Sequence, residues 1–177
     1  MRSHFSDINS DSPLANLTAV TATSETGLWA VATFTPINPG EARAGKAWKL
    51  TAGGIMSFNS TGNLIITPRI GTTTGGATLG PNVVAVTTPG ATTAHPWILE
   101  FNLTCRTIAP AGNNSTFIGT GSFITGTPGA AGDAVAVCFG GTVASADSTV
   151  AQGLFIGWTL SVAGTITPQY IHWQALN

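Results

Sequence analysis

Two segments of the chain alternate apolar and polar residues with a period of two. Residues 97–107 (WILEFNLTCRT) place an apolar set on one face and polar residues on the other, with Ile98 as the exception. The apolar set is Trp97, Leu99, Phe101, Leu103 and Cys105. Residues 154–162 (LFIGWTLSV) repeat the pattern, with Phe155 as the large apolar residue on the second face. Because successive side chains of a strand point to opposite faces, each segment predicts a strand with one buried and one exposed face.

Shorter apolar runs, separated by segments rich in Gly, Pro and Thr, predict further strands. They cover residues 28–35, 46–51, 54–58, 64–70, 83–87, 116–124, 134–141 and 166–174. Longer loops are expected at 71–82 and 88–96. The pair Ala163-Gly164 predicts a hairpin between the last two strands, since glycine accepts the positive φ of tight turns. No segment of ten or more residues shows the 3.6-residue period of a helix.

About ten short strands within roughly 150 residues predict an all-β fold, either a β-sandwich or a barrel. We favour a single-domain β-sandwich of jelly-roll type over residues 28–177. An immunoglobulin-like sandwich is the alternative, although the expected Cys-Trp-Cys spacing is absent. Residues 1–27 are rich in Ser, Thr, Asp and Asn with little periodicity. They predict a flexible N-terminal arm, either a disordered terminus or a segment that a partner orders.

The chain is poor in charge, and this changes the expected surface. Charged residues make up 7% of the 177 residues, against about 25% in a typical soluble domain. With a net charge of -1, such a surface is poorly protected against association. We therefore expect sister subunits or a larger assembly to cover much of it. A secreted, glycan-rich or surface-layer protein would share this composition.

The same composition argues against two classes of partner. The six Lys and Arg residues are scattered and form no basic stripe, so no nucleic-acid partner is expected. No apolar run approaches the roughly 18–20 residues that span a bilayer, so no membrane partner is expected. The N-terminal residues are too polar for a signal peptide, and we expect the protein to be made in a cytoplasm.

Residues capable of catalysis or metal binding are few. Cys105 and Cys138 fall in apolar runs and predict two buried, reduced thiols. Either could form a nucleophilic pair with His95 or His172, but core packing explains them better. No Cys-x-x-Cys motif and no His pair with ligand spacing is present, so neither a metal nor another cofactor is expected.

Four carboxylates are candidates for a glycosidase pair, which needs two acids across one sugar bond. They are Glu41, Glu100, Asp133 and Asp147. Their positions on the polar face of a strand and in loops favour solvated side chains. No catalytic residue is therefore predicted, and the protein is expected not to be an enzyme.

Tryptophan is frequent, with five residues against a single tyrosine. Trp48 and Trp173 are candidates for a platform on which sugars stack. Trp173 is opposite in phase to Tyr170 and His172, so one of these two faces is expected to meet a neighbouring subunit. Tyr170, His172 and Trp173 are the predicted subunit-interface residues.

The order of several segments resembles that of small virion proteins of tailed bacteriophages. The segments are KAWKLTAGGIMSF, LIITPRIGTTTGGATLG, PWILEFNLTCRTIA, GTGSF and LFIGWTLSVAGTITPQYIHWQALN, within residues 28–177. The resemblance implies a jelly-roll sandwich that forms a homotrimer and decorates or cements the capsid surface. It also implies binding to major capsid protein subunits and assembly in the bacterial host cytoplasm. No catalytic residue comes with this family.

The resemblance also implies that the N-terminal arm helps to bind the shell. The capsid-contact candidates in the arm are Arg2, His4, Phe5 and Asp7. The alternative function is a tail or head-fibre adhesion module that binds a host surface glycan, with the loops at 71–82 and 88–96 as the ligand-facing segments. Sandwich architectures serve both head and tail, so the fold does not decide between them.

Overall fold

We describe a computed structural model of the chain. It describes residues 21, 24–27, 37–71, 76–79, 85–88, 91–109, 115–126 and 135–176. Several sequence-based predictions lie outside these residues. They are the strand at 28–35, the carboxylate Asp133, and the arm residues Arg2, His4, Phe5 and Asp7.

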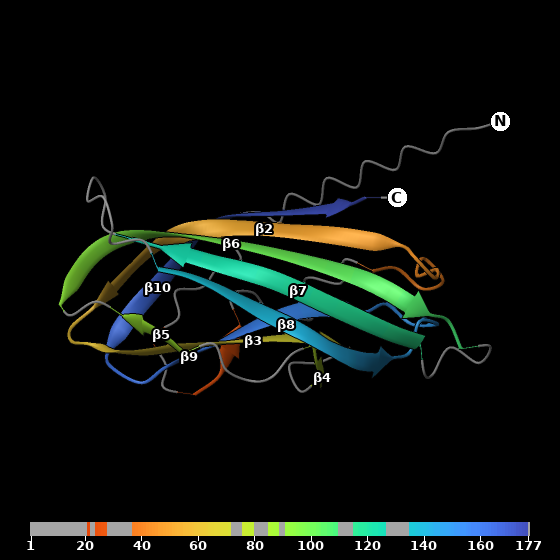
Figure 1. Cartoon of the computed structure of the whole chain (residues 1–177), viewed down its shortest axis with the longest axis horizontal. Helices are drawn as coiled ribbons and strands as arrows, with labels where there is room; N and C mark the ends of the chain where they lie inside the picture. Colours follow the sequence, from red (N-terminus) through yellow and green to blue (C-terminus); the bar gives the residue numbers. More distant parts are fainter. Residues whose placement is uncertain are drawn as a thin grey trace.

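The described chain is all-β, as predicted, and none of its described residues lies in a helix. Two antiparallel five-stranded sheets pack as a sandwich (Figure 1). Sheet A has the order β10 (Gly164–Ala175), β2 (Ala47–Phe58), β6 (Thr92–Thr107), β7 (Ser115–Thr125) and β8 (Val135–Ala146). Sheet B has the order β1 (Thr26–Gly27), β9 (Gly153–Leu160), β3 (Gly62–Gly71) and β4 (Ala77–Thr78), with β5 (Ala85–Thr88) also paired to β3.

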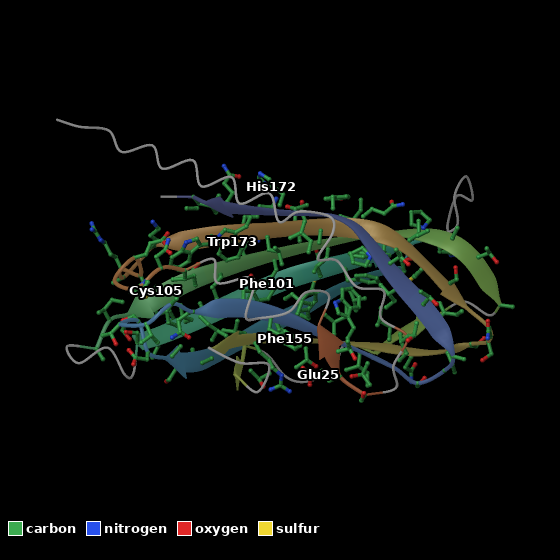
Figure 2. All side chains as sticks on the ribbon, turned by 180° about the vertical axis from the view of Figure 1, so that it is seen from behind. Glu25, Phe101, Cys105, Phe155, His172 and Trp173 are labelled. Carbon is green, nitrogen blue, oxygen red and sulfur yellow. The ribbon has the colours of Figure 1, made fainter. Side chains whose placement is uncertain are left out.

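The core fills the space between the sheets. All five apolar positions predicted on the inner face of 97–107 are at most 2% exposed, which confirms the alternation in β6. In Figure 2, Phe101 lies between the two layers. Trp97 of sheet A and Trp158 of sheet B meet at 5.3 Å between ring centroids. Burying such large aromatic side chains contributes strongly to stability, at about 25 cal/mol per Å² of apolar area.

The predicted hairpin at Ala163-Gly164 is wrong, because the two strands belong to different sheets. Strand β9 pairs in sheet B, whereas β10 pairs with β2 in sheet A, so residues 161–163 cross between the sheets. A Cβ at Gly164 would lie 2.5 Å from the Phe58 ring, so this glycine serves close packing.

A second crossing, at residues 59–61 between β2 and β3, lies beside the first. The Asn59 N–H donates to the Ala163 carbonyl at 3.1 Å, and the Ser161 N–H donates to the Asn63 carbonyl at 2.9 Å. The Asn63 N–H in turn donates to the Ser161 hydroxyl at 2.7 Å. The antiparallel pair β2/β10 of sheet A therefore continues round the edge as the pair β3/β9 of sheet B.

Strand β2 is continuous where two strands, 46–51 and 54–58, were predicted. The Gly53-Gly54 pair that suggested a turn lies mid-strand and pairs with Ile98 and Trp97. Glycine occurs at these two positions because β10 approaches β2 closely here, where the register of β10 shifts between Pro168 and Tyr170. A Cβ at Gly54 would lie 2.1 Å from the backbone oxygen of Thr167. Glycine is needed here for space rather than for a turn.

The loop predicted at 88–96 is also largely wrong, because β6 already begins at Thr92. Pro96 suggested a loop, since proline cannot donate a ladder hydrogen bond. Its partner is Ile55 of β2, and the pairing of β6 with β7 begins only at Trp97. Pro96 thus sits where β6 has one paired neighbour, which is the position that a strand proline tolerates.

Candidate functional site

The outer face of sheet A carries a row of apolar residues that crosses all five strands. Direct pairing runs from Tyr170 to Gly53, then to Ile98, Ile124 and Ala136. Ile98 is 47% exposed, and Ile124 and Tyr170 are each 44% exposed. We call Tyr170, Ile98, Ile124 and Ala136 the apolar row. Cross-strand neighbours in register lie about 5 Å apart, so these side chains form one connected strip.

Gly53 is the position that makes the strip continuous. A Cβ there would lie 2.5 Å from the Tyr170 ring, so the ring occupies the space above β2. The Tyr170 ring thereby lies over β2, the strand that separates β10 from β6, on which Ile98 lies. Tyr170 is a predicted interface residue, whereas in sequence Ile98 is only an exception to the alternation of 97–107.

The neighbouring row on the same face is polar. It consists of His172, Thr51, Glu100, Ser122 and Cys138, in register across the same five strands. Lys49 Nζ lies 3.1 Å from Glu100 Oε1, with side chains 34% and 47% exposed. Such an exposed pair contributes about 0–1 kcal/mol, but it leaves this part of the face without net charge.

A shallow hollow opens in the polar part of this face. It has a volume of about 460 Å³ and is lined by Glu100, Asn102, Thr120, Gly121, Ser122, Cys138, Phe139 and Gly140. The register of β7 and β8 shifts next to it, between Ile118 and Thr120. Gly140 has a φ of 100°, a conformation that favours glycine. Carboxylate, amide and hydroxyl groups thus converge on one open depression.

The three predicted interface residues do not share a face. Tyr170 and His172 lie on the outer face, where Figure 2 shows His172 pointing away from the sandwich. Trp173 is 2% exposed and stacks on Trp48 at 6.4 Å between ring centroids. The predicted opposition of phase is confirmed. Because Trp48 and Trp173 are core residues, they are not available as the sugar-stacking platform that the sequence suggested.

The cysteine and histidine candidates are not brought together. Cys105 and His95 both face the core but lie ten residues apart on β6, about 33 Å along a strand. Cys138 and His172 share the outer face but stand four strand spacings apart, about 19 Å. The remaining combinations join opposite faces of sheet A. No described pair has the geometry of an activated nucleophile.

The prediction of two buried thiols is half right. Cys105 is buried, and burial raises the pKa of its thiol, which therefore stays protonated and inert. Cys138 is exposed, which corrects the prediction, and neither cysteine forms a disulfide. The apolar run 134–141 has no alternation that would assign a phase to Cys138.

Each described carboxylate among the catalytic candidates has its own local partner. Glu41 accepts hydrogen bonds from the Asn38 N–H, Trp48 Nε1 and Lys46 Nζ. Burial alone would raise the pKa of Glu41, but these bonds outweigh burial and hold it below the ordinary value. Asp147 accepts from the hydroxyl and N–H of Thr149, and both bonds lower its pKa.

The outer face of sheet B is organised differently, around an ion pair that sequence reasoning missed. Arg69 Nε and Nη2 each lie 2.8 Å from a Glu25 oxygen. The hydrogen bond that Arg69 donates to Glu25 favours the charged guanidinium and raises its pKa. We call Glu25 and Arg69 the N-terminal clamp. The two residues are 44 positions apart and carry no signal of pairing in the sequence.

The clamp lies over glycine and beside a covered aromatic ring. A Cβ at Gly157 would lie 2.2 Å from a Glu25 oxygen, and a Cβ at Gly27 would lie 2.0 Å from the Phe155 ring. Phe155 points to the outer side of β9 yet is 3% exposed. Figure 2 shows Glu25 and Phe155 near each other at the short strand β1. Residues 24–27 therefore form part of the cover of this face.

Comparisons with protein-family models, with curated proteins and with solved structures find no match to this chain. Within the described ranges, no group of three or more His, Cys, Asp and Glu residues could hold a metal ion. The part of the chain that the structure describes also contains no helix long and apolar enough to cross a membrane.

Proposed function

We propose that this protein is a non-enzymatic virion component that decorates and stabilises a bacteriophage capsid surface as a homotrimer. The observation that carries the proposal is the difference between the outer faces of the sandwich. Sheet B holds residues 24–27 through the N-terminal clamp. Sheet A presents a regular, open face with the apolar row across it. Such a layout suits a protein that is anchored by one side and meets neighbours with the other.

The scarcity of charge supports an assembled state. Only 7% of the residues are charged, and the exposed Lys49–Glu100 pair cancels within the open face. A face without net charge does not repel a neighbour, and exposed apolar side chains gain by being covered. Many copies on a symmetric shell would bind with avidity, so each contact can be weak.

We further propose that the sandwich is of jelly-roll type. In support, the strand pairs β2/β10 and β3/β9 run together round one edge, as in a ribbon wrapped around a core. Strands β6, β7 and β8 add a simple antiparallel meander to sheet A. The wrapped pairs are the jelly-roll element of this proposal.

The shell contact is proposed for the N-terminal arm, with Arg2, His4, Phe5 and Asp7 as candidates. Strand β1 pairs with β9 at the edge of sheet B, and Glu25 just before it is held by Arg69. Residues 24–27 therefore mark the point on the sandwich from which the arm would reach the shell. The proposed partners are major capsid protein subunits at the virion surface.

The test compares otherwise identical phage shells with and without the protein. Shells that carry it should release their contents at a higher temperature and survive lower ionic strength. Adding purified protein back to bare shells should restore the difference. Identical failure of both shells, with the protein shown to be bound, would contradict the stabilising function.

Glycan adhesion is a second candidate, and the hollow on sheet A favours it. Glu100, Asn102, Thr120 and Ser122 offer donors and acceptors of the kind that hold sugar hydroxyls. A glycan array probed with the full chain and with Asn102→Ala tests it. Binding that the substitution abolishes would support adhesion, whereas no binding of the wild-type chain would exclude it for the glycans on the array.

A further inference from the structure

We infer that the apolar row of sheet A is the contact surface between copies of this chain. The inference rests on the proposed homotrimer and names the residues that would hold it together. Single exposed apolar residues are ordinary on protein surfaces, but a connected strip is a marker of an interaction site. Here Ile98 and Ile124 are direct cross-strand partners in the middle of the sheet.

A second apolar pair lies on the same face, apart from the apolar row. Ile118 and Val143 form a second direct pair on β7 and β8, and Val143 is 42% exposed. Three other large apolar residues, Ile108, Val150 and Leu176, are exposed outside the strands of sheet A or at its end. The strip and the second pair therefore share one face, with the polar rows between them.

The whole outer face of sheet A has about the area of one side of a standard protein interface. Five strands about 4.8 Å apart, each about ten residues long at 3.4 Å per residue, present roughly 800 Å². A standard protein interface buries about 800 Å² per partner. In a closed trimer each copy contacts two neighbours, so the face of sheet A is divided between two smaller contacts.

The charge pattern favours a second copy over a charged partner. Beyond the polar row lies a further row in register, formed by Gln174, Lys49, Asn102, Thr120 and Gly140. In the apolar row and these two polar rows, the charged side chains are Lys49 and Glu100. They form an exposed pair of opposite sign. When copies meet in a closed ring, Lys49 of one can face Glu100 of the next, so opposite charges meet across each contact. A strongly charged partner would find no opposite field on this face.

The position of Cys138 allows the face itself to be monitored. Cys138 is exposed and lies two residues from Ala136 of the apolar row, whereas Cys105 is buried. A copy that covers the row should shield Cys138 from alkylation by a maleimide. Cys105 should stay unreactive in every folded sample, which makes it an internal check on folding.

The decisive experiment compares the alkylation rate of Cys138 in the full chain and in two variants. Ile98→Lys places a charge in the row, and Val150→Lys makes the same kind of change at a residue that is 42% exposed outside the row. At equal concentration, Cys138 should react at least about threefold faster in Ile98→Lys, because dissociation exposes it. Val150→Lys should react like the wild-type chain.

Equal rates in Ile98→Lys and wild type would overturn the inference, provided both chains are folded. If Cys105 also reacts in Ile98→Lys, the variant has unfolded and Ile124→Thr replaces it, since threonine keeps strand propensity while removing apolar surface.

A second arm separates this inference from the proposed function. Protection of Cys138 by added shells, but not by rising protein concentration, would show that a capsid subunit occupies the row. The copy contact would then be wrong and the decoration function would stand. A chain that binds shells in neither assay and never associates would contradict both.

Discussion

The two outer faces of the sandwich differ in what becomes of an apolar side chain that points away from the core. On sheet B, Phe155 points outward and is 3% exposed. On sheet A, Ile98 and Ile124 point outward and are 47% and 44% exposed. Successive side chains alternate in direction along both strands, but β9 is buried on both faces, whereas β6 is buried on its inner face alone. The chain thus covers one outward apolar position itself and leaves the other open.

Glycine placement decides which side chain can lie over a strand. On sheet B, Gly157 and Gly27 leave room for Glu25 and Phe155 to come close. On sheet A, Gly53 leaves room for Tyr170, which enlarges the open strip. In both places the missing Cβ serves close approach. On sheet B the close packing holds residues 24–27 in place, and on sheet A it extends the exposed apolar strip.

The largest expected effect comes from truncating the covered ring. Phe155→Ala should lower the free energy of unfolding by about 3 kcal/mol, because a buried aromatic side chain is lost. Ile124→Ala is the matched change on the open face and should cost less than about 1 kcal/mol in the dissociated chain. Urea unfolding measures both. Equal costs would mean that the two faces are not covered differently.

The N-terminal clamp gives the next largest effect. Glu25→Gln removes a two-point ion pair whose side chains are 20% and 29% exposed, and it should cost about 1–2 kcal/mol. Glu100→Gln makes the same change in the exposed pair of sheet A and should cost about 0–0.5 kcal/mol. Hydrogen exchange at Gly27 should quicken only in Glu25→Gln. Unchanged exchange there would show that the clamp does not hold β1.

A third, smaller effect than that of the clamp is expected at Glu41, which belongs to neither outer face and serves as a reference. Its pKa is lowered in the folded chain, so its contribution is present above the ordinary value of 4.5 and is lost as pH falls through the lower folded value. Glu41→Gln should cost about 1 kcal/mol at neutral pH, and the difference from wild type should shrink below about pH 4. Urea midpoints across pH measure it. A cost that stays constant into acid would show that the carboxylate charge is not the cause.

The sequence predicts the fold class and the inner face of the strands, but the outer faces are harder to predict. The strict alternation of 97–107 identified the core positions of β6, and Trp97 and Trp158 were correctly placed there. The turns expected at Gly53-Gly54 and at Gly164 are wrong, because a glycine needed for close packing resembles a turn residue in sequence.

The candidate site was predicted only in part. Tyr170 and His172 were identified by phase, while Cys138 was placed inside because its run is apolar on both faces. The row depends on register across five strands, which the order of residues does not encode locally. The clamp depends on a contact 44 residues apart, and neither partner lies in a recognisable motif.

The native mass of the wild-type chain, measured by light scattering over a range of dilutions, shows whether copies of the chain cover the open face of sheet A. The account predicts an assembly of three chains of 17.9 kDa that falls to single chains in Ile98→Lys. A wild-type chain that stays at 17.9 kDa at every concentration would contradict it, because the open face of sheet A would then have no copy to cover it.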